Sequence, residues 1–258
     1  MIYDNVGFTY DNTRKADPYI VSRIIYHLNP KSGCKYLDIA CGTGNYTIAL
    51  KESGVDITGY DQSQTMVNIA KSKNSQVSFY VSDVESIAVD DNAFQGGICT
   101  LAIHHFNDLN RAFQELSRVI SRGRLVIFTC SHEQIRGYWL NEYFKTSIDR
   151  MYEYMPDYNC VESALHQSGF NVLYTEPYFV QEDLCDGFLY CKKNHPEAYL
   201  DRSFLLGMSV FSLKANNSEI EAGCQKLETD ICSGRIKSVM KSYSSYPHGD
   251  YMFIVAEK

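Results

Sequence analysis

The sequence predicts an α/β fold in which a parallel sheet is covered by helices on both faces and a cap is inserted late in the chain. Three observations predict it. Short apolar runs alternate with segments of helical spacing along residues 17–130, as in parallel sheets with crossover helices. The run at 124–130 (RLVIFTC) is almost wholly apolar, which is typical of a strand buried on both faces. The alternation stops at 131–159 and at 179–250, and interruptions this long are more often functional than idle.

Seven segments are predicted to be strands. They comprise residues 34–40, 56–61, 77–83, 97–102, 124–130, 171–178 and 251–257. The first predicted helix follows Asp17-Pro18, which has the pattern of an N-cap and a first-turn proline. Further helices are expected at 45–53, from residue 63 onward, at 108–120 and at 160–168. Seven aromatic residues fall in the first interruption without a strand signal: Tyr138, Trp139, Tyr143, Phe144, Tyr152, Tyr154 and Tyr158.

Composition limits the class of protein. With 258 residues, 45% of them hydrophobic, the chain can bury a full core as one domain or as one domain with a cap. The formal net charge of −7 argues against a nucleic-acid-binding protein, because such proteins usually carry an excess of basic residues. A local basic patch is still compatible with this net charge. No apolar run approaches the roughly 18 residues of a membrane-spanning helix. Nine scattered cysteines, with no CxxC pair and no signal-like N-terminus, indicate reduced, mostly buried thiols, so we expect a soluble cytoplasmic protein.

The stretch LDIACGTGNYT, residues 37–47, places two glycines directly after a predicted strand. Gly42 and Gly44 indicate that the backbone comes close to a ligand there. A dinucleotide site requires a third glycine, and a triphosphate loop requires a Lys followed by Ser or Thr; both are missing. Asp38 stands before the glycines instead, where a carboxylate repels a pyrophosphate and attracts an ammonium group. The ligand is therefore expected to be cationic and not phosphorylated.

A set of ordered motifs carries a family resemblance. They are LDIACGTGNYT, ITGYDQSQTM, FYVSDVESI, GGICTLAIHHF and RVISRGRLVIFTC, preceded by YDNTRKADPYIV. Together they resemble the class I S-adenosylmethionine-dependent methyltransferases, in the type-11 small-molecule branch, where the last segment named is similar to an N-terminal lid. The resemblance is close over about residues 10–130 and looser over the last two strands.

The resemblance implies a fold, a cofactor and a domain organisation. The fold is a Rossmann-like, doubly wound and mostly parallel sheet of seven strands, with the last strand antiparallel. S-adenosylmethionine is the implied cofactor and S-adenosylhomocysteine the product. We expect a single domain, residues 1–258, and its parts are a core at about 30–130, 160–178 and 251–258, an N-terminal lid at 1–29, and cap insertions at 131–159 and 179–250.

Cofactor-binding residues are carried over from the resemblance one by one. The implied set is Tyr10, Arg14, Asp38, Ala40, Cys41, Gly42, Gly44, Asp61, Gln62, Met66, Asp83, Val84 and Leu101. Asp38 is expected to face the methionine ammonium, Asp61 to accept from both ribose hydroxyls, and Asp83 to accept from the adenine amino group. Cys41 fills a small-residue position in the motif and is expected to be inert.

Several of these residues have a structural alternative. Asp61 could be the N-cap of the next helix, although Ser63 can take that role. Asp83 could cap a loop, and Met66 could simply pack in the core. Arg14 could pair with the carboxylate of the cofactor or be a surface charge.

His104 and His105 directly follow the fourth predicted strand, where the transferred methyl group is expected. Adjacent loop residues seldom point the same way, so we expect one ring to face the methyl group and the other to pack or cap. We assign His105 to the acceptor side, because Phe106 beside it has the character of a core anchor. A histidine there can take a proton near neutral pH, and a base is required only if the nucleophile arrives protonated.

No metal site is expected, since no cluster of His, Cys, Asp or Glu has ligand spacing. Cys185, Cys191 and His195 come nearest to a zinc site, and a thiolate site for arsenite with Cys160, Cys185 or Cys191 has weak support. The expected partner is a small-molecule methyl acceptor, and monomer and homodimer both stay open. Two alternatives remain: a cofactor-binding protein without transfer activity, and a methyltransferase that acts on a macromolecule.

Overall fold

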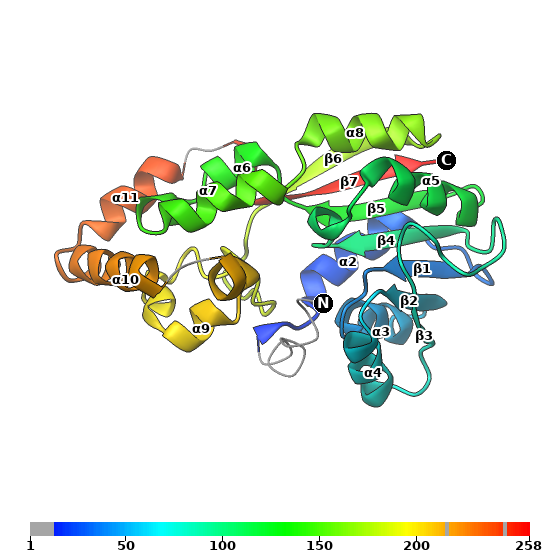
Figure 1. The fold of residues 1–258 in the computed structure, drawn as a ribbon, viewed down its shortest axis with the longest axis horizontal. Helices are drawn as coiled ribbons and strands as arrows, with labels where there is room; N and C mark the ends of the chain where they lie inside the picture. Colours follow the sequence, from blue (N-terminus) through cyan, green and yellow to red (C-terminus); the bar gives the residue numbers. More distant parts are fainter. Residues whose placement is uncertain (1–12, 215–216, 245–246) are drawn as a thin grey trace.

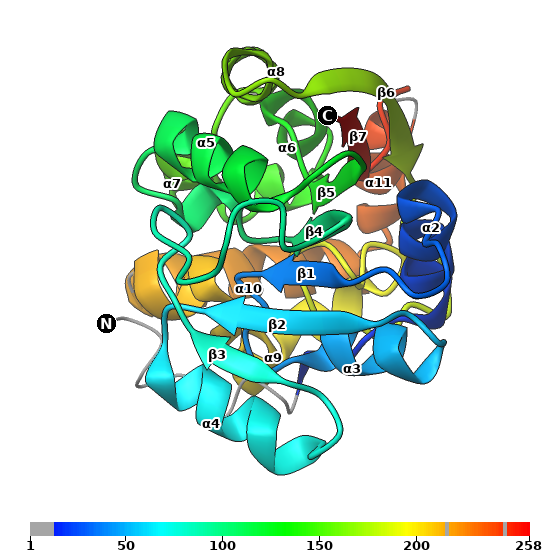
Figure 2. The ribbon, with the colours of Figure 1, turned by 90° about the vertical axis from the view of Figure 1, so that its right-hand side faces the viewer.

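The sheet has the predicted seven strands. The computed structural model describes residues 13–214, 217–244 and 247–258. Its strands are β1 (Tyr36–Ile39), β2 (Ile57–Asp61), β3 (Phe79–Val81), β4 (Gly96–Thr100), β5 (Arg124–Thr129), β6 (Asn171–Tyr178) and β7 (Tyr251–Glu257), in the order β3-β2-β1-β4-β5-β7-β6. β7 pairs antiparallel with both β5 and β6, and the other pairs are parallel. The mostly parallel sheet with an antiparallel last strand is thus confirmed (Figure 2).

Helices cover both faces of this sheet, as predicted. The helices α2 (Pro18–Leu28), α3 (Asn45–Glu52) and α4 (Gln64–Lys73) belong to one face, and α5 (Leu109–Val119) and α8 (Tyr158–Gln167) to the other (Figure 2). The apolar run of β5 explains how one strand serves both layers. Val126 and Phe128 join the core cluster of Ile20 in α2, whereas Leu125 and Ile127 join the cluster on the α5 and α8 side. Alternate side chains of a strand point to opposite faces, so a strand covered twice must be apolar throughout.

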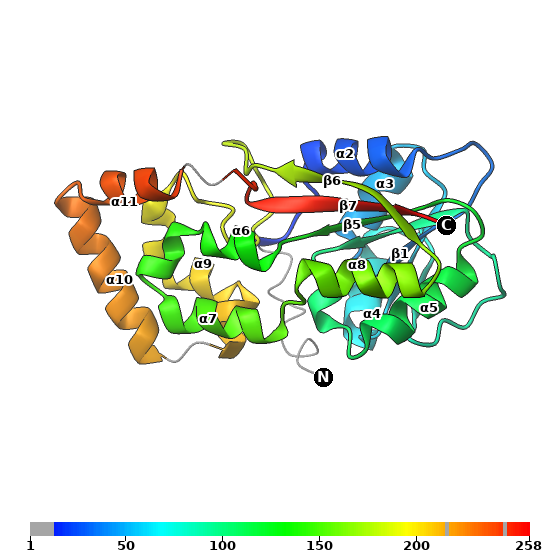
Figure 3. The ribbon, with the colours of Figure 1, turned by 90° about the horizontal axis from the view of Figure 1, so that it is seen from above.

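The two interruptions form helices that gather at one end of the sheet (Figures 1 and 3). We call them the cap, and they are α6 (His132–Arg136), η3 (Trp139–Glu142), α7 (Lys145–Tyr154), η4 (Pro196–Leu200), α9 (Arg202–Leu206), η5 (Val210–Lys214), α10 (Asn217–Cys232) and α11 (Ile236–Tyr243). The two insertions meet in space: the Ser147 hydroxyl donates to Glu219 at 2.8 Å, and the Tyr143 hydroxyl donates to Asp230 at 2.9 Å. None of the helices in the described part of the chain is both long and apolar enough to cross a membrane.

The cap shares a hydrophobic core with one face of the sheet. Tyr138, Trp139 and Phe144 from the first insertion are at most 2% exposed and belong to the same cluster as Phe128 of β5. The hydroxyl of Tyr138 also donates to the carbonyl of Asp250 at 2.6 Å, just before β7. Most of the aromatic residues singled out in the first insertion therefore build the cap and tie it to the sheet.

The nine cysteines are all free thiols, but they are not mostly buried as expected. Only Cys99, Cys130 and Cys191 are buried, and Cys160, Cys185 and Cys232 are exposed. The prediction was wrong because a cysteine that is isolated in the sequence carries no periodic signal that shows whether its side chain faces the core or the solvent.

Candidate functional site

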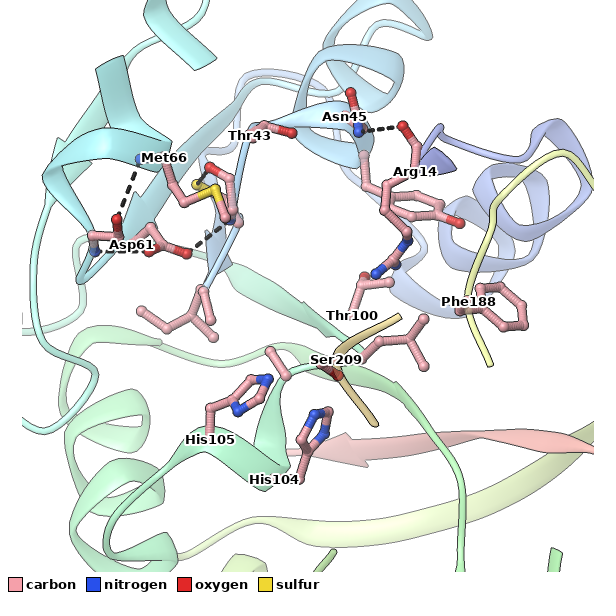
Figure 4. A pocket seen from close by; sticks show the side chains of 18 of the residues that line it. Arg14, Thr43, Asn45, Asp61, Met66, Thr100, His104, His105, Phe188 and Ser209 are labelled. Atoms are coloured by element: carbon pink, nitrogen blue, oxygen red, sulfur yellow. Dashed lines mark hydrogen bonds between the residues drawn. The ribbon is translucent and has the colours of Figure 1, made fainter. Parts of the chain in front are cut away.

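A cavity lies where the carboxyl ends of the parallel strands meet the cap (Figure 4). Its walls include the turn after β1, the end of β2 and the turn after β4, which are the places where an open parallel sheet binds ligands. The opposite wall comes from the cap and is largely apolar. We call this wall the acceptor end, and it includes Met151, Met155, Phe188, Leu189, Met208 and Val210.

A glycine is required at each of the two positions after β1, but for different structural reasons. Gly42 has φ +54°, and a Cβ added there would meet nothing within 4 Å, so its open side belongs to the cavity that it lines. Gly44 has φ +76°, and a Cβ there would lie 2.6 Å from Cζ of Phe79 and 3.1 Å from Cβ of Ala70. Gly44 is not among the described residues that line the cavity. It allows α3 and α4 to pack closely on the sheet, whereas Gly42 leaves room for a ligand.

Two carboxylates stand beside this turn. Asp38 is 2% exposed and accepts a hydrogen bond from the Thr47 hydroxyl at 2.6 Å, and burial raises its pKa to about 7. Asp61 ends β2 and accepts from the backbone N–H groups of Gly42 and Ser63, both at 2.8 Å. Burial raises the pKa of Asp61, and these two hydrogen bonds oppose that shift. Ser63, not Asp61, is the N-cap of α4. Asp61 is thereby held rigidly with both oxygens near the cavity.

The structure brings the other implied cofactor residues to the same cavity. Its lining includes Ala40, Cys41, Gln62, Met66, Asp83, Val84 and Leu101. Asp83 also accepts from the Glu85 backbone N–H at 2.9 Å, so it caps a turn while it faces the cavity. Met66 is 2% exposed and also lines the cavity, so its position is compatible with both core packing and contact with the cofactor. Burial raises the pKa of Cys41 well above its usual range, as expected of an inert thiol. Tyr10 lies outside the described residues.

Arg14 has a protein partner that the sequence did not indicate. Its guanidinium forms a two-pronged ion pair with Asp186, with Nε 2.6 Å from Oδ1 and Nη2 3.2 Å from Oδ2. The Tyr46 hydroxyl of α3 donates to the same carboxylate at 3.0 Å, and the Asp186 side chain is fully buried. The backbones of Gly187 and Thr13 also approach each other closely, since a Cβ added to Gly187 would lie 2.5 Å from the carbonyl oxygen of Thr13. The N-terminal segment is therefore fastened to the second cap insertion at the cavity wall.

The histidine pair is arranged differently from the expectation. His104 and His105 belong to a short 3₁₀ turn, η2 (Ile103–His105), and their ring centroids are 3.9 Å apart. Both rings line the cavity and point into it (Figure 4). The prediction that one of them packs away was wrong, because the cavity extends around the turn and reaches two successive side chains.

Candidate metal ligands are not gathered into one site. Within the described ranges, no group of three or more His, Cys, Asp or Glu side chains is placed to hold a metal ion. The Sγ of Cys185 lies 3.5 Å from the Asp17 carboxylate, and the His195 ring lies between Glu182 at 3.1 Å and Glu197 at 3.5 Å.

Comparison with known proteins identifies the family. Residues 37–128 match the family described as "Methyltransferase domain". The solved structure of a putative methyltransferase from an antibiotic biosynthesis pathway of Anabaena variabilis is 31% identical and superposes with a TM-score of 0.83, over 94% of this chain and 98% of that one. The chain belongs to the class I S-adenosylmethionine-dependent methyltransferases, in their type-11 family.

Curated relatives of this methyltransferase match it over about half of its length. It is 31% identical over 149 residues to a malonyl-[acyl-carrier protein] O-methyltransferase of Buchnera aphidicola, covering 56% of this chain and 58% of the relative. It is 28% identical over 137 residues to a demethylmenaquinone methyltransferase of Staphylococcus epidermidis, covering 49% and 57%. The match thus spans less than two thirds of these relatives.

The residues of the glycine turn fit S-adenosylmethionine, the cofactor of this family. That molecule carries an ammonium group, a sulfonium and two ribose hydroxyls, and it has no phosphate. The turn offers open space beside Gly42 together with the carboxylates of Asp38 and Asp61. A site of this chemistry attracts a cationic ligand, as the order of acid and glycines in the sequence predicts.

Proposed function

We propose that this protein transfers a methyl group from S-adenosylmethionine to a small-molecule acceptor that is bound beneath the cap. One observation carries the proposal. A single cavity is lined by the glycine turn with its carboxylates, by the histidine pair and by the apolar acceptor end (Figure 4). A donor and an acceptor held in one cavity can react without diffusing apart, which is the main requirement of a displacement reaction.

The carboxylates of this chain would hold the cofactor. Asp61 is fixed by two backbone N–H donors, and its remaining lone pairs can accept from both ribose hydroxyls. Asp38 would face the ammonium group, and Asp83 the adenine amino group. When it is bound, the cofactor supplies an electrophilic methyl group on sulfur.

The cap would exclude water and orient the acceptor. Its six apolar side chains at the acceptor end give that part of the cavity a low polarity, which favours reaction of a desolvated nucleophile. His105 lines the same cavity, and we propose it as the residue that takes a proton from the acceptor when the nucleophile is a hydroxyl, a thiol or an ammonium group.

The named relatives support a small acceptor. Their names give a malonyl group on an acyl-carrier protein and demethylmenaquinone as the acceptors of those proteins. The match spans less than two thirds of either relative, so these names do not identify the acceptor of this protein.

The first test is cofactor binding. S-adenosylmethionine or S-adenosylhomocysteine should raise the melting temperature of the purified protein, because a ligand that binds only the native state stabilises it. A response to NAD with none to either adenosyl compound would overturn the proposal. Transfer is then measured with methyl-labelled cofactor and a panel of acceptors; binding without transfer to any of them would favour a cofactor-binding protein instead.

A further inference from the structure

The two ring nitrogens of His104 have different surroundings. Its Nδ1 is buried and has no hydrogen-bond partner among the described residues, although the ring lines the cavity and points into it (Figure 4). The edge of the ring that faces the cavity is therefore the one that carries Nε2. Buried N–H groups without an acceptor are rarer in proteins than buried acceptors without a donor. The single proton of the neutral ring accordingly belongs on Nε2.

A second proton on His104 is disfavoured. Burial lowers the pKa of His104 well below its usual range, and the neighbouring His105 and Arg14 act in the same direction. The additional proton would have to sit on Nδ1, where no acceptor lies among the described residues. His104 is thus a neutral side chain that presents an N–H group to the cavity.

The six side chains that define the acceptor end are uncharged. Within the described part of the cavity wall, the positive charges are Arg14 and Lys15, and the carboxylates are Asp186 and, at the strand ends where the cofactor is proposed to bind, Asp38, Asp61 and Asp83. Arg14 is paired with Asp186 on the same wall, and Lys15 is exposed. Burial raises the pKa of both Cys130 and Tyr154 to about 12, so these groups stay protonated and neutral. A charged acceptor would lose its hydration there without gaining a partner.

We propose that the acceptor end takes an uncharged, mainly apolar molecule, and that His104 donates a hydrogen bond from its Nε2–H to an oxygen atom of that molecule. This inference rests on the proposed function, since it describes the acceptor of that reaction. The hydrogen bond fixes the orientation of the oxygen relative to the histidine turn. Met151, Met155 and Met208 are long, flexible side chains that adapt to the apolar part of the molecule.

Nitrogen-15 NMR of the histidine side chains tests the tautomer in the intact protein. The His104 signals are assigned as those lost in His104→Gln, with His105→Gln as the matched control. We expect His104 to keep its proton on Nε2 and to show no titration between about pH 5.5 and pH 8. A His104 ring that titrates in this range, or that carries its proton on Nδ1, overturns the proposal. The measurement needs no methyl transfer, so it fails or succeeds independently of the proposed function.

Calorimetry with three probes tests the class of acceptor. 2-Naphthol is compared with 2-naphthoate and 2-naphthylmethylammonium, all in the presence of S-adenosylhomocysteine. We expect the naphthol to bind at least tenfold more tightly than either ion. His104→Phe should weaken naphthol binding about fivefold to tenfold because it removes the donor, and His104→Gln, which keeps a side-chain N–H, should stay within about threefold. Failure of the naphthol to bind, equal binding of an ion, or unchanged binding in His104→Phe overturns the proposal.

Discussion

Replacing Gly44 by alanine is expected to destabilise the protein much more than the same change at Gly42. Both glycines have positive φ, +76° and +54°, which costs an alanine about 1–2 kcal/mol at either position. Only at Gly44 does the new methyl group meet other atoms, at 2.6 Å from Phe79 and 3.1 Å from Ala70. Overpacking of this kind adds about 1–3 kcal/mol. The expected loss of unfolding free energy is therefore about 2–5 kcal/mol for Gly44→Ala and about 1–2 kcal/mol for Gly42→Ala.

Thermal and denaturant unfolding without ligand measure this difference. For a chain of this size about 1 kcal/mol corresponds to 2–4 °C, so the two melting temperatures should differ by roughly 2–12 °C. Affinity for S-adenosylhomocysteine should show the opposite ranking, with Gly42→Ala the more damaging change. The methyl group of Gly42→Ala projects into the open space of the cavity, and that of Gly44→Ala does not.

A double mutant separates the clash from the backbone strain. Phe79→Leu shortens the side chain that the Gly44→Ala methyl group meets, so the two changes together should destabilise by at least about 1 kcal/mol less than the sum of the singles. Simple additivity, or a Gly44→Ala protein as stable as Gly42→Ala, would refute the assignment of the two glycines to packing and to ligand approach.

Three further perturbations have expected outcomes. Asp61→Ala should weaken binding of S-adenosylhomocysteine by about 2–4 kcal/mol in calorimetry, since it removes the acceptor of both ribose hydroxyls; unchanged affinity contradicts that role. With the pKa of Asp38 at about 7, the dissociation constant of S-adenosylhomocysteine should rise about tenfold per pH unit below 7 and level off above it, and Asp38→Asn should abolish this slope. Asp186→Asn leaves Arg14 without its anion and should cost about 3–5 kcal/mol of stability, whereas Asp56→Asn, in an exposed ion pair, should cost under about 1 kcal/mol.

The sheet and its helices were predictable because local patterns determine them. Asp17 was expected to cap the first helix, and its carboxylate accepts from the backbone N–H groups of Tyr19 and Ile20. The apolar run of β5 indicated a doubly covered strand from composition alone. For these helices and strands, the errors lie in the predicted end positions. The helix expected from residue 160 begins two residues earlier, at Tyr158, because Asp157 is its N-cap.

The partner of Arg14 was not predictable from the sequence. Asp186 lies 172 residues further along the chain, in a segment without periodicity, and nothing near it marks it as a buried acid. The sequence left open whether Arg14 pairs with a carboxylate, that of the cofactor, or is a surface charge. It could not show that the protein supplies one itself, since that depends on how the second cap insertion returns to the sheet.

The cap shows why composition is a poor guide to a binding wall. Only Tyr154 of the seven aromatic residues in the first insertion is among the described residues that line the cavity. Tyr138 and Trp139 fill the space between the cap and the sheet instead. An insertion that covers a sheet edge must first bury a core of its own, because short helices without tertiary packing are unstable. Most of the large aromatic side chains of the first insertion are buried in that core, and flexible side chains such as Met151 and Met155 of the same insertion are left to line the cavity.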